Sequence, residues 1–390
     1  MNVLVISAWC PYPPSNGAKL RAYFLLEQLA RRHTVTLLTF AHPSEHAEPE
    51  AAALTRLCRE VRVVQGSPVY ERRDGRAGWF STMPRSLASS ISADMQREVE
   101  RALPGHDVAL GLTQWSAPYL LNRPGRPRVL DELELTAIAE KRQANGVARL
   151  RHGMTWWKQA RFVRRASEEF ARITVASDRE RTLAVAAGCN PERVSIVPNG
   201  VAREWLNLPR ASVDKGRLVY PGSITYPPNL DAVRFFVNEV LPKVRDARPQ
   251  TTLYVTGSTT CAPIEELAAK PGVVFTGHVA DVRTQVAKSE VCVVPLLSGG
   301  GTRLKVLEAL ALGVPVVATT KGAEGLTLED GRELLIADTP SSLAVATLRL
   351  LDDGDLAARL SAAGRRAVAE RFTWDIAGDA LERVLTEACQ

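Results

Sequence analysis

The stretch that most constrains the fold of this chain runs from Val291 to Leu326 and reads VCVVPLLSGGGTRLKVLEALALGVPVVATTKGAEGL. Its first seven residues are apolar, as expected of a buried parallel strand. A glycine triplet and a helix-prone segment, Arg303–Leu312, follow. Gly313 and Pro315 then stand where they would end that helix before a second apolar run. This order predicts a βαβ unit in a parallel sheet.

The junction between the glycines and the predicted helix is typical of an anion site, because free N–H groups and the helix dipole point the same way there. Arg303 and Lys305 place two cations in the first turn, where a helix favours acids, so an anion is expected beside them. Glu308, one turn later, is placed to accept hydrogen bonds from sugar hydroxyls. The alternative is an ordinary βαβ turn with surface charges. A diphosphate at the glycines and a sugar at the glutamate would make this a site for a nucleotide sugar, the donor of a sugar group. Its predicted residues in this stretch are Gly300, Gly301, Thr302, Arg303, Lys305 and Glu308.

The whole string resembles the donor-binding signature of the retaining glycosyltransferases of family 4, which have the GT-B fold. Glu308–Val317, EALALGVPVV, matches the family pattern E-A-x-A-x-G-x-P-V-V position for position. The family usually carries another glutamate eight residues earlier, where this chain has Gly300. A subgroup with a G-x-G-T-R-L-K loop is similar to Gly299–Lys305 instead. The resemblance implies an α/β chain of two Rossmann-like domains with a cleft between them, and sugar transfer from a nucleotide diphosphate sugar without a metal or other cofactor.

The length of 390 residues suits two domains. We predict an N-terminal acceptor domain over residues 1–205, a donor domain over 206–372, and a C-terminal helix over 373–390 that packs back on the first domain. Apolar content of 45% and charged content of 24% are ordinary for a globular protein. No apolar run is long enough for a transmembrane helix, and the N-terminus does not resemble a signal peptide. Six cysteines without a CxxC pair favour a cytoplasmic protein.

The first predicted strand, Asn2–Ser7, is followed by a loop rich in proline and glycine. This loop does not read G-x-G-x-x-G, so a dinucleotide dehydrogenase is disfavoured. Asn16-Gly17-Ala18 resembles the glycine pair with which family 4 faces the donor phosphates, and Gly17 is therefore a donor-binding candidate. A plain βα turn is the alternative.

Acidic residues follow the predicted strand Arg128–Asp131. Acids at the carboxyl end of a strand are candidates for catalysis. Family 4 enzymes often carry a histidine where this chain has Leu133, and the related subgroup tends to place an acid beside it. We predict Glu134 as the active-site acid, supported by Asp131. The alternative for Glu134 is a carboxylate that stabilises the N-terminus of a helix over Thr136–Gln143. Trp115, in the loop after the predicted strand Val108–Leu110, is the acceptor candidate.

Two further loops of the second half resemble the family. Pro221-Gly222-Ser223 is similar to the loop that approaches the donor phosphates, although its usual basic residue is absent. Phe275–Val279 resembles the F-x-G-x-V turn that reads the nucleobase, which makes Gly277 and His278 candidates. His278 is more simply explained as a stacking or turn residue than as a general base.

The segment 141–172 carries nine basic residues against two acidic ones, with Met154, Trp156 and Trp157 interleaved. Such a segment is typical of a helix that rests on an anionic membrane, and it suits a lipid-linked acceptor and a peripheral position at the inner face of the membrane. Nucleic acid is disfavoured because no recognition module accompanies it. The simpler interpretation is a solvated helical face with tryptophans packed in the core.

These observations predict a retaining glycosyltransferase that acts on a glycan or lipid-linked acceptor in polysaccharide, glycolipid or cell-envelope glycan synthesis. Two rivals stay open. One is a GT-B-like sugar epimerase, which would need catalytic groups that the sequence does not reveal. The other is a non-enzymatic nucleotide-sugar-binding protein, since Gly300 and Leu133 replace residues that the family often uses.

Overall fold

The computed structural model describes residues 1–41, 52–66, 81–142, 146–208, 212–260 and 262–390. The chain divides into two compact units. Unit 1 comprises Met1–Asn199 and Trp374–Gln390, and unit 2 comprises Gly200–Thr373. The division lies a few residues before the predicted boundary at 205/206. The reason is that Val201 pairs with Thr373 and donates its N–H to the Phe372 carbonyl oxygen, so the residues after Asn199 join the second unit.

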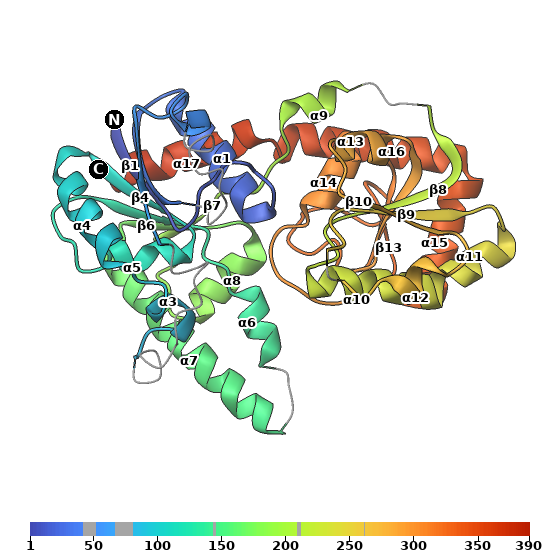
Figure 1. Cartoon of the computed structure of the whole chain (residues 1–390), viewed down its shortest axis with the longest axis horizontal. Helices are drawn as coiled ribbons and strands as arrows, with labels where there is room; N and C mark the ends of the chain where they lie inside the picture. The colour runs from blue at the N-terminus through green and yellow to red at the C-terminus, as the bar shows by residue number, and fades with distance from the viewer. Residues whose placement is uncertain (42–51, 67–80, 143–145, 209–211, 261) are drawn as a thin grey trace. The chain divides into compact units, whose positions relative to one another are not determined.

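Unit 1 is built on a seven-stranded sheet in which all neighbouring strands are parallel (Figure 1). The strand order is β3-β2-β1-β4-β5-β6-β7. Central strands are buried along nearly their whole length, which explains their continuous apolar runs. The strands are β1 (Asn2–Ser7), β2 (Thr34–Phe40), β3 (Glu60–Val64), β4 (Val108–Leu112), β5 (Arg128–Asp131), β6 (Arg172–Val175) and β7 (Val194–Ile196).

The helices of unit 1 include its last segment, α17, which packs on α1. The rings of Phe24 and Trp374 stack with centroids 5.2 Å apart, and Gln28 donates a 3.1 Å hydrogen bond to Asp375. The described helices are α1 (Gly17–Ala30), α3 (Arg85–Ala88), α4 (Ala93–Ala102), α5 (Ala117–Leu120), α6 (Thr136–Lys141), α7 (Gly146–Glu169), α8 (Asp178–Ala186) and α17 (Trp374–Ala388), with 3₁₀ turns η1 (Leu103–Gly105) and η2 (Gln114–Ser116).

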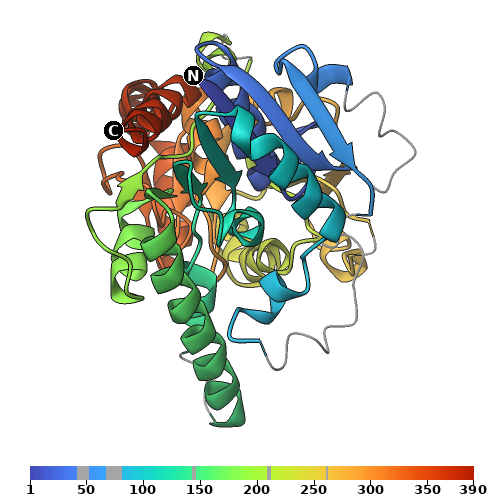
Figure 2. The same cartoon turned by 90° about the vertical axis from the view of Figure 1, so that its left-hand side faces the viewer.

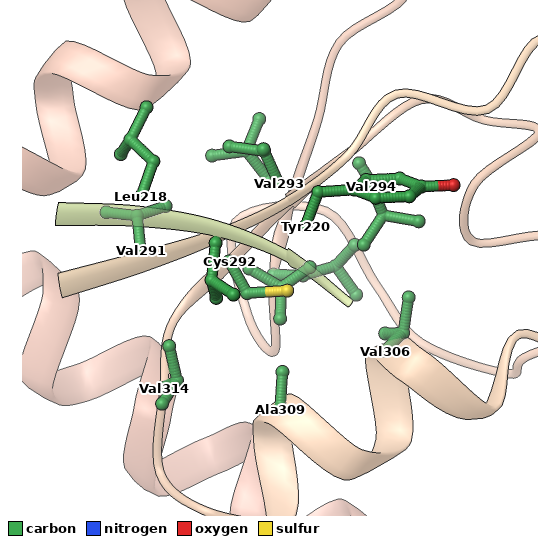
Figure 3. Packing of buried hydrophobic residues seen from close by; sticks show 14 of the residues in the cluster. Leu218, Tyr220, Val291, Cys292, Val293, Val294, Val306, Ala309 and Val314 are labelled. Atoms are coloured by element: carbon green, nitrogen blue, oxygen red, sulfur yellow. The ribbon is translucent and has the colours of Figure 1, made fainter. Parts of the chain in front are cut away.

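Unit 2 has a six-stranded parallel sheet in the order β10-β9-β8-β11-β12-β13. Figure 3 shows its core, where Tyr220 of β8 and Val291–Val294 of β11 pack near Val306 and Ala309 of α14. The strands are β8 (Asp214–Pro221), β9 (Thr252–Thr256), β10 (Val273–Gly277), β11 (Ser289–Val294), β12 (Val316–Ala318) and β13 (Leu335–Ile336). The helices are α9 (Arg203–Asn207), α10 (Pro227–Phe235), η3 (Phe236–Val240, a π-helix), α11 (Leu241–Ala247), α12 (Glu265–Ala268), α13 (Val282–Ala287), α14 (Leu304–Ala311), α15 (Pro340–Asp352) and α16 (Gly354–Arg371).

Two local expectations differ from the structure. Helix α1 begins at Gly17 rather than Leu20, because the Asn16 side chain accepts a 3.0 Å hydrogen bond from the Lys19 N–H and caps the helix earlier. The segment 202–215, which the sequence suggests is a linker, holds helix α9 and the start of β8. No helix within the described residues is long and apolar enough to cross a bilayer.

Candidate active site

The glycine loop between β11 and α14 is organised by Arg303, the residue immediately before the helix. Its buried guanidinium donates hydrogen bonds to the carbonyl oxygens of Gly299 at 2.7 Å, Gly300 at 2.8 Å and Lys321 at 3.1 Å. These bonds draw the loop carbonyls to the arginine, while the first N–H groups of α14 have no partners within the helix. Arg303 therefore shapes the loop. A direct contact of Arg303 with a ligand stays a prediction.

Lys305 lies in the first turn of α14 and reaches the carboxyl end of β8. Its Nζ donates to the Tyr220 hydroxyl at 2.8 Å and to the Asn229 Oδ1 at 3.0 Å, and lies 4.0 Å from the centre of the Tyr220 ring. Gly222 leaves room for this ammonium, because a Cβ at that position would lie 2.7 Å from Nζ. The cation is thus held at the edge of the sheet where parallel α/β units bind ligands.

The polar groups around Lys305 form a connected chain. The Tyr220 hydroxyl donates to Asn229 Oδ1 at 2.8 Å, and Asn229 Nδ2 donates to the Ser223 carbonyl oxygen at 2.7 Å. Burial raises the pKa of Tyr220, so its hydroxyl keeps its proton at neutral pH. The chain fixes both the lysine and the loop after β8 in one arrangement.

Lys305 and Glu308 have strongly shifted pKa values. Desolvation by burial lowers the pKa of Lys305 to about 7, with Arg303 acting in the same direction and Glu308 opposing. Desolvation also raises the pKa of Glu308 to about 7, and Lys305 opposes that shift. Both groups therefore titrate near neutrality, which is a property of ligand-binding and catalytic sites.

The other donor candidates of unit 2 lie along neighbouring strand ends. Gly222 follows β8, and Gly257, which sequence reasoning missed, follows β9 with φ +138°. A Cβ on Gly257 would lie 2.5 Å from the Gly222 carbonyl oxygen, and the Gly257 N–H donates to the Gly277 carbonyl oxygen at 3.0 Å. His278, next along the chain, is exposed. The strand order therefore brings Gly222 and Gly277 onto one edge through Gly257.

In unit 1, Asp131 lies in a buried ion pair with Arg21. The guanidinium donates to the two carboxylate oxygens at 2.9 and 2.7 Å, and each side chain is 1% exposed. Thr174 Oγ1 donates to the same carboxylate at 2.5 Å, and Arg21 also donates to Asn199 Oδ1 at 2.8 Å. Asp131 thus ties three strand ends and the first helix together, and its part in catalysis stays a prediction.

Another carboxylate lies at the start of the helix that follows Glu134. Glu180 of α8 accepts hydrogen bonds from the N–H groups of Leu135 at 2.7 Å and Thr136 at 3.1 Å, at the start of α6. Glu134 is partly exposed just before this helix. Its catalytic role and its alternative role at the helix N-terminus both stay predictions.

Two non-glycine residues at the same sheet edge have left-handed backbone conformations. Thr113 follows β4 with φ 65°, and Glu132 follows the adjacent strand β5 with φ 54°. Such conformations cost about 1–3 kcal/mol each and concentrate at functional sites. Desolvation raises the pKa of Glu132 to about 8, with Asp131 and Glu134 adding to it. The sequence did not single out Glu132, because nothing in the run Asp131–Glu134 indicates which of its acids adopts the left-handed backbone conformation.

Two buried polar atoms at this edge have no hydrogen-bond partner among the described residues. They are Thr113 Oγ1 and the indole Nε1 of Trp9, which follows β1 next to β4. Trp115, in η2, is half-buried against the core of unit 1. Gly17 is exposed at the first position of α1. Unpartnered polar groups, a strained backbone and an acid of raised pKa together favour a polar ligand here.

Comparison with known proteins bears on the second unit most directly. Residues 215–353 match the family model described as Glycosyl transferases group 1. A relative from Klebsiella pneumoniae, described as an uncharacterized protein in the cps region, is 22% identical over 86% of this chain and 87% of its own length. A GDP-mannose-dependent monoacylated phosphatidylinositol monomannoside mannosyltransferase from Corynebacterium glutamicum is 30% identical over 38% of this chain and 42% of its own length.

Solved structures extend the comparison to the whole chain. The Anabaena protein HepE, crystallised with UDP and glucose, superposes with a TM-score of 0.71 at 16% identity and covers 99% of both chains. At that identity the likeness concerns the fold alone, and it agrees with the predicted α/β architecture of two Rossmann-like units of the GT-B type. The segment that is similar to the glycosyl transferases group 1 model, residues 215–353, carries the glycine loop, Lys305 and Glu308.

Proposed function

We propose that this protein is a retaining glycosyltransferase that moves a sugar from a nucleotide diphosphate sugar to an acceptor in polysaccharide, glycolipid or cell-envelope glycan synthesis. The observation that carries the proposal is the placement of Lys305. Its ammonium is held at the carboxyl end of β8 by Tyr220 and Asn229, beside a glycine loop whose carbonyls are drawn to Arg303.

The chemistry of the leaving group explains this arrangement. When the bond between the sugar and the diphosphate breaks, the nucleotide diphosphate keeps the electron pair and gains negative charge. A preorganised cation and the positive end of the α14 helix dipole stabilise that charge as it develops. Because the cation comes from Lys305, we expect no metal to be required for donor binding or transfer.

The acceptor is proposed to bind at the edge of the sheet of unit 1. The acceptor hydroxyl attacks the anomeric carbon on the face that the diphosphate leaves, so the configuration is retained, and its proton passes to the carboxylate of Glu134, the predicted active-site acid. Glu132, with its raised pKa, and the unpartnered Thr113 hydroxyl are suited to hydrogen-bond further acceptor hydroxyls. A glycan or a lipid-linked sugar supplies such hydroxyls.

The relatives suggest where a search for the donor should start. One is described as GDP-mannose-dependent, and HepE was crystallised with UDP and glucose. GDP-mannose and UDP-glucose are therefore the first donors to test, in buffer with EDTA and with simple glycosides as acceptors. We expect transfer of the sugar with unchanged anomeric configuration.

The rival functions give different results in this assay. A nucleotide-sugar-binding protein without activity would bind a donor but release no nucleotide diphosphate. An epimerase would change the stereochemistry of the sugar without an acceptor. Inversion of the anomeric centre in the product would contradict the retaining mechanism while leaving glycosyl transfer intact.

A further inference from the structure

Helix α7 (Gly146–Glu169) differs sharply between its two halves. The second half packs into unit 1, where Gln159, Phe162 and Val163 are 1%, 3% and 0% exposed. In the first half, Leu150, Met154 and Trp157 are 76%, 64% and 54% exposed. Figures 1 and 2 both show this first half extending away from the rest of unit 1. The helix therefore presents large apolar side chains to its surroundings.

These three side chains form one stripe, because residues three and four apart lie on the same face of a helix. Three of the nine large hydrophobic side chains exposed in the described part of the chain fall within this run of eight residues. Removing such a side chain from water is favourable in free energy. A cluster of three exposed ones is typical of a surface that is covered by a partner.

The charges around the stripe identify the partner. Arg151 and Lys158 lie beside it, and Arg161 continues its face one turn beyond Trp157. The two acids of the helix, Glu168 and Glu169, stand at its far end. The Arg142 guanidinium adds a further cation, 5.0 Å from the Trp156 ring. An apolar stripe flanked by cations complements a surface with an apolar interior and an anionic boundary.

We propose that the first half of α7 docks on an anionic phospholipid membrane, with Leu150, Met154 and Trp157 inserted below the headgroups and the flanking cations at the lipid phosphates. Two copies of this chain would bring like charges together, which disfavours self-association through the same face. The membrane would place the protein beside a lipid-linked acceptor, and this link to catalysis rests on the proposed function.

The test is flotation of the full chain with vesicles of phosphatidylcholine containing roughly a third phosphatidylglycerol, beside vesicles of phosphatidylcholine alone. We expect the protein to float with the anionic vesicles, less at high salt, and to stay largely unbound with the neutral ones. The triple variant Leu150→Asn/Met154→Gln/Trp157→Asn should lose flotation. Its fold should be kept because all three side chains are exposed. The control Val345→Asn, at a side chain 57% exposed on α15, should float like the wild type.

A second pair of variants tests the charges. Arg149→Gln/Arg151→Gln should weaken binding to anionic vesicles about thirtyfold, since each cation near the surface strengthens the partition roughly fivefold. Arg97→Gln/Arg101→Gln on α4 removes the same charge from the same unit, at side chains 61% and 69% exposed. This control should bind nearly as the wild type does.

The proposal is overturned if the wild type does not float, if neutral and anionic vesicles bind equally, or if the controls lose binding as the α7 variants do. Binding of a single-stranded oligonucleotide through α7 without vesicle binding would assign the surface to nucleic acid instead. A change of oligomeric state in the triple variant, without vesicle binding by the wild type, would assign it to a second copy. Thermal shifts with nucleotide sugars should be the same in all these variants. If the wild type shows none, the proposed function fails while the vesicle result still decides the docking.

Discussion

The Nζ of Lys305 lies 2.8 Å from the hydroxyl of Tyr220 and above the ring of the same tyrosine. One side chain of β8 thus holds the ammonium both by a hydrogen bond and by its ring face. Since the loop Pro221-Gly222-Ser223 lacks the basic residue usual in the family it resembles, we propose that Lys305, in the first turn of α14, supplies the cation for a donor diphosphate instead.

Tyr220→Phe should separate the two contacts, because the ring stays and the hydroxyl is lost. A hydrogen bond to a charged group contributes roughly 1.5–3 kcal/mol, so affinity for the nucleotide sugar should fall at least about tenfold. Isothermal titration measures this change. Tyr254→Phe, on the neighbouring strand β9, is the control, because Tyr254 contacts Arg217 and not Lys305. Equal affinity in wild type and Tyr220→Phe would contradict the role of the hydroxyl.

Donor affinity should fall as pH rises through neutrality. The pKa of Lys305 is lowered to about 7, and a bound anion favours the charged lysine and raises that pKa. The lysine is protonated in the free protein at pH 6 and largely neutral at pH 8, so the affinity should drop roughly tenfold between them. Lys305→Arg, always charged, should flatten the profile. A flat profile in the wild type would show that Lys305 does not meet the anion.

Gly222→Ala should displace the lysine. The added Cβ would lie 2.7 Å from Nζ, and the backbone φ of +149° is strained for any other residue. We expect at least a tenfold loss of donor affinity together with a loss of about 1–3 kcal/mol in the free energy of unfolding. Gly331→Ala isolates the backbone effect, since its φ is +73° and no atom lies within 4 Å of its Cβ position. Similar donor affinities in both variants would refute the steric argument.

Substitutions of Asp131 and Glu134 should differ in their effects on stability and on turnover. Asp131→Asn breaks a buried ion pair and should lower the free energy of unfolding by about 3–5 kcal/mol. Glu134→Gln should leave stability nearly unchanged and lower the turnover more than the donor affinity. Urea unfolding and initial rates distinguish the two. A Glu134 variant with the wild-type rate would end its candidacy as the base.

The carboxyl group of Glu132 should make the free energy of unfolding depend on pH. Its pKa of about 8 in the folded state lies above the ordinary value of 4.5 for a glutamate, so the folded state binds more protons than the unfolded state between these pH values. Stability contributed by this group is therefore present below pH 4.5 and is lost as the pH rises towards 8. Glu132→Gln should abolish this loss and gain about 1–3 kcal/mol relative to the wild type at pH 8. Parallel pH profiles of unfolding for both proteins would show that the carboxyl does not titrate in this range.

The sequence predicted the strands well where burial on both faces imposes a continuous apolar run, as in β1 and β5, whose bounds agree with the structure. It also placed α17, because a long amphipathic segment at the end of the chain has few alternatives. The predicted linker was wrong since the short helix α9 has too few residues to show a period.

The side-chain contacts of the candidate site could not be predicted from the sequence as well as the strands could. Tyr220 reads as one more apolar strand residue, and its hydroxyl gains a role only through Lys305, 85 residues away. Glu180, which caps α6, is likewise 45 residues away in sequence from Leu135, whose N–H it accepts. Side-chain partners of this kind depend on tertiary packing, for which a single sequence carries no pattern.

The most direct test of the central claim is donor binding by the wild type and Lys305→Met, measured by titration of GDP-mannose and UDP-glucose at pH 6.5 with EDTA present. That pH lies on the charged side of the lowered pKa of Lys305. We predict that the wild type binds at least one of the two and that the variant binds it more than tenfold less tightly, while melting at a similar temperature. Equal binding by both proteins, or no binding of either donor by the folded wild type, would contradict the assignment of Lys305 to the donor diphosphate.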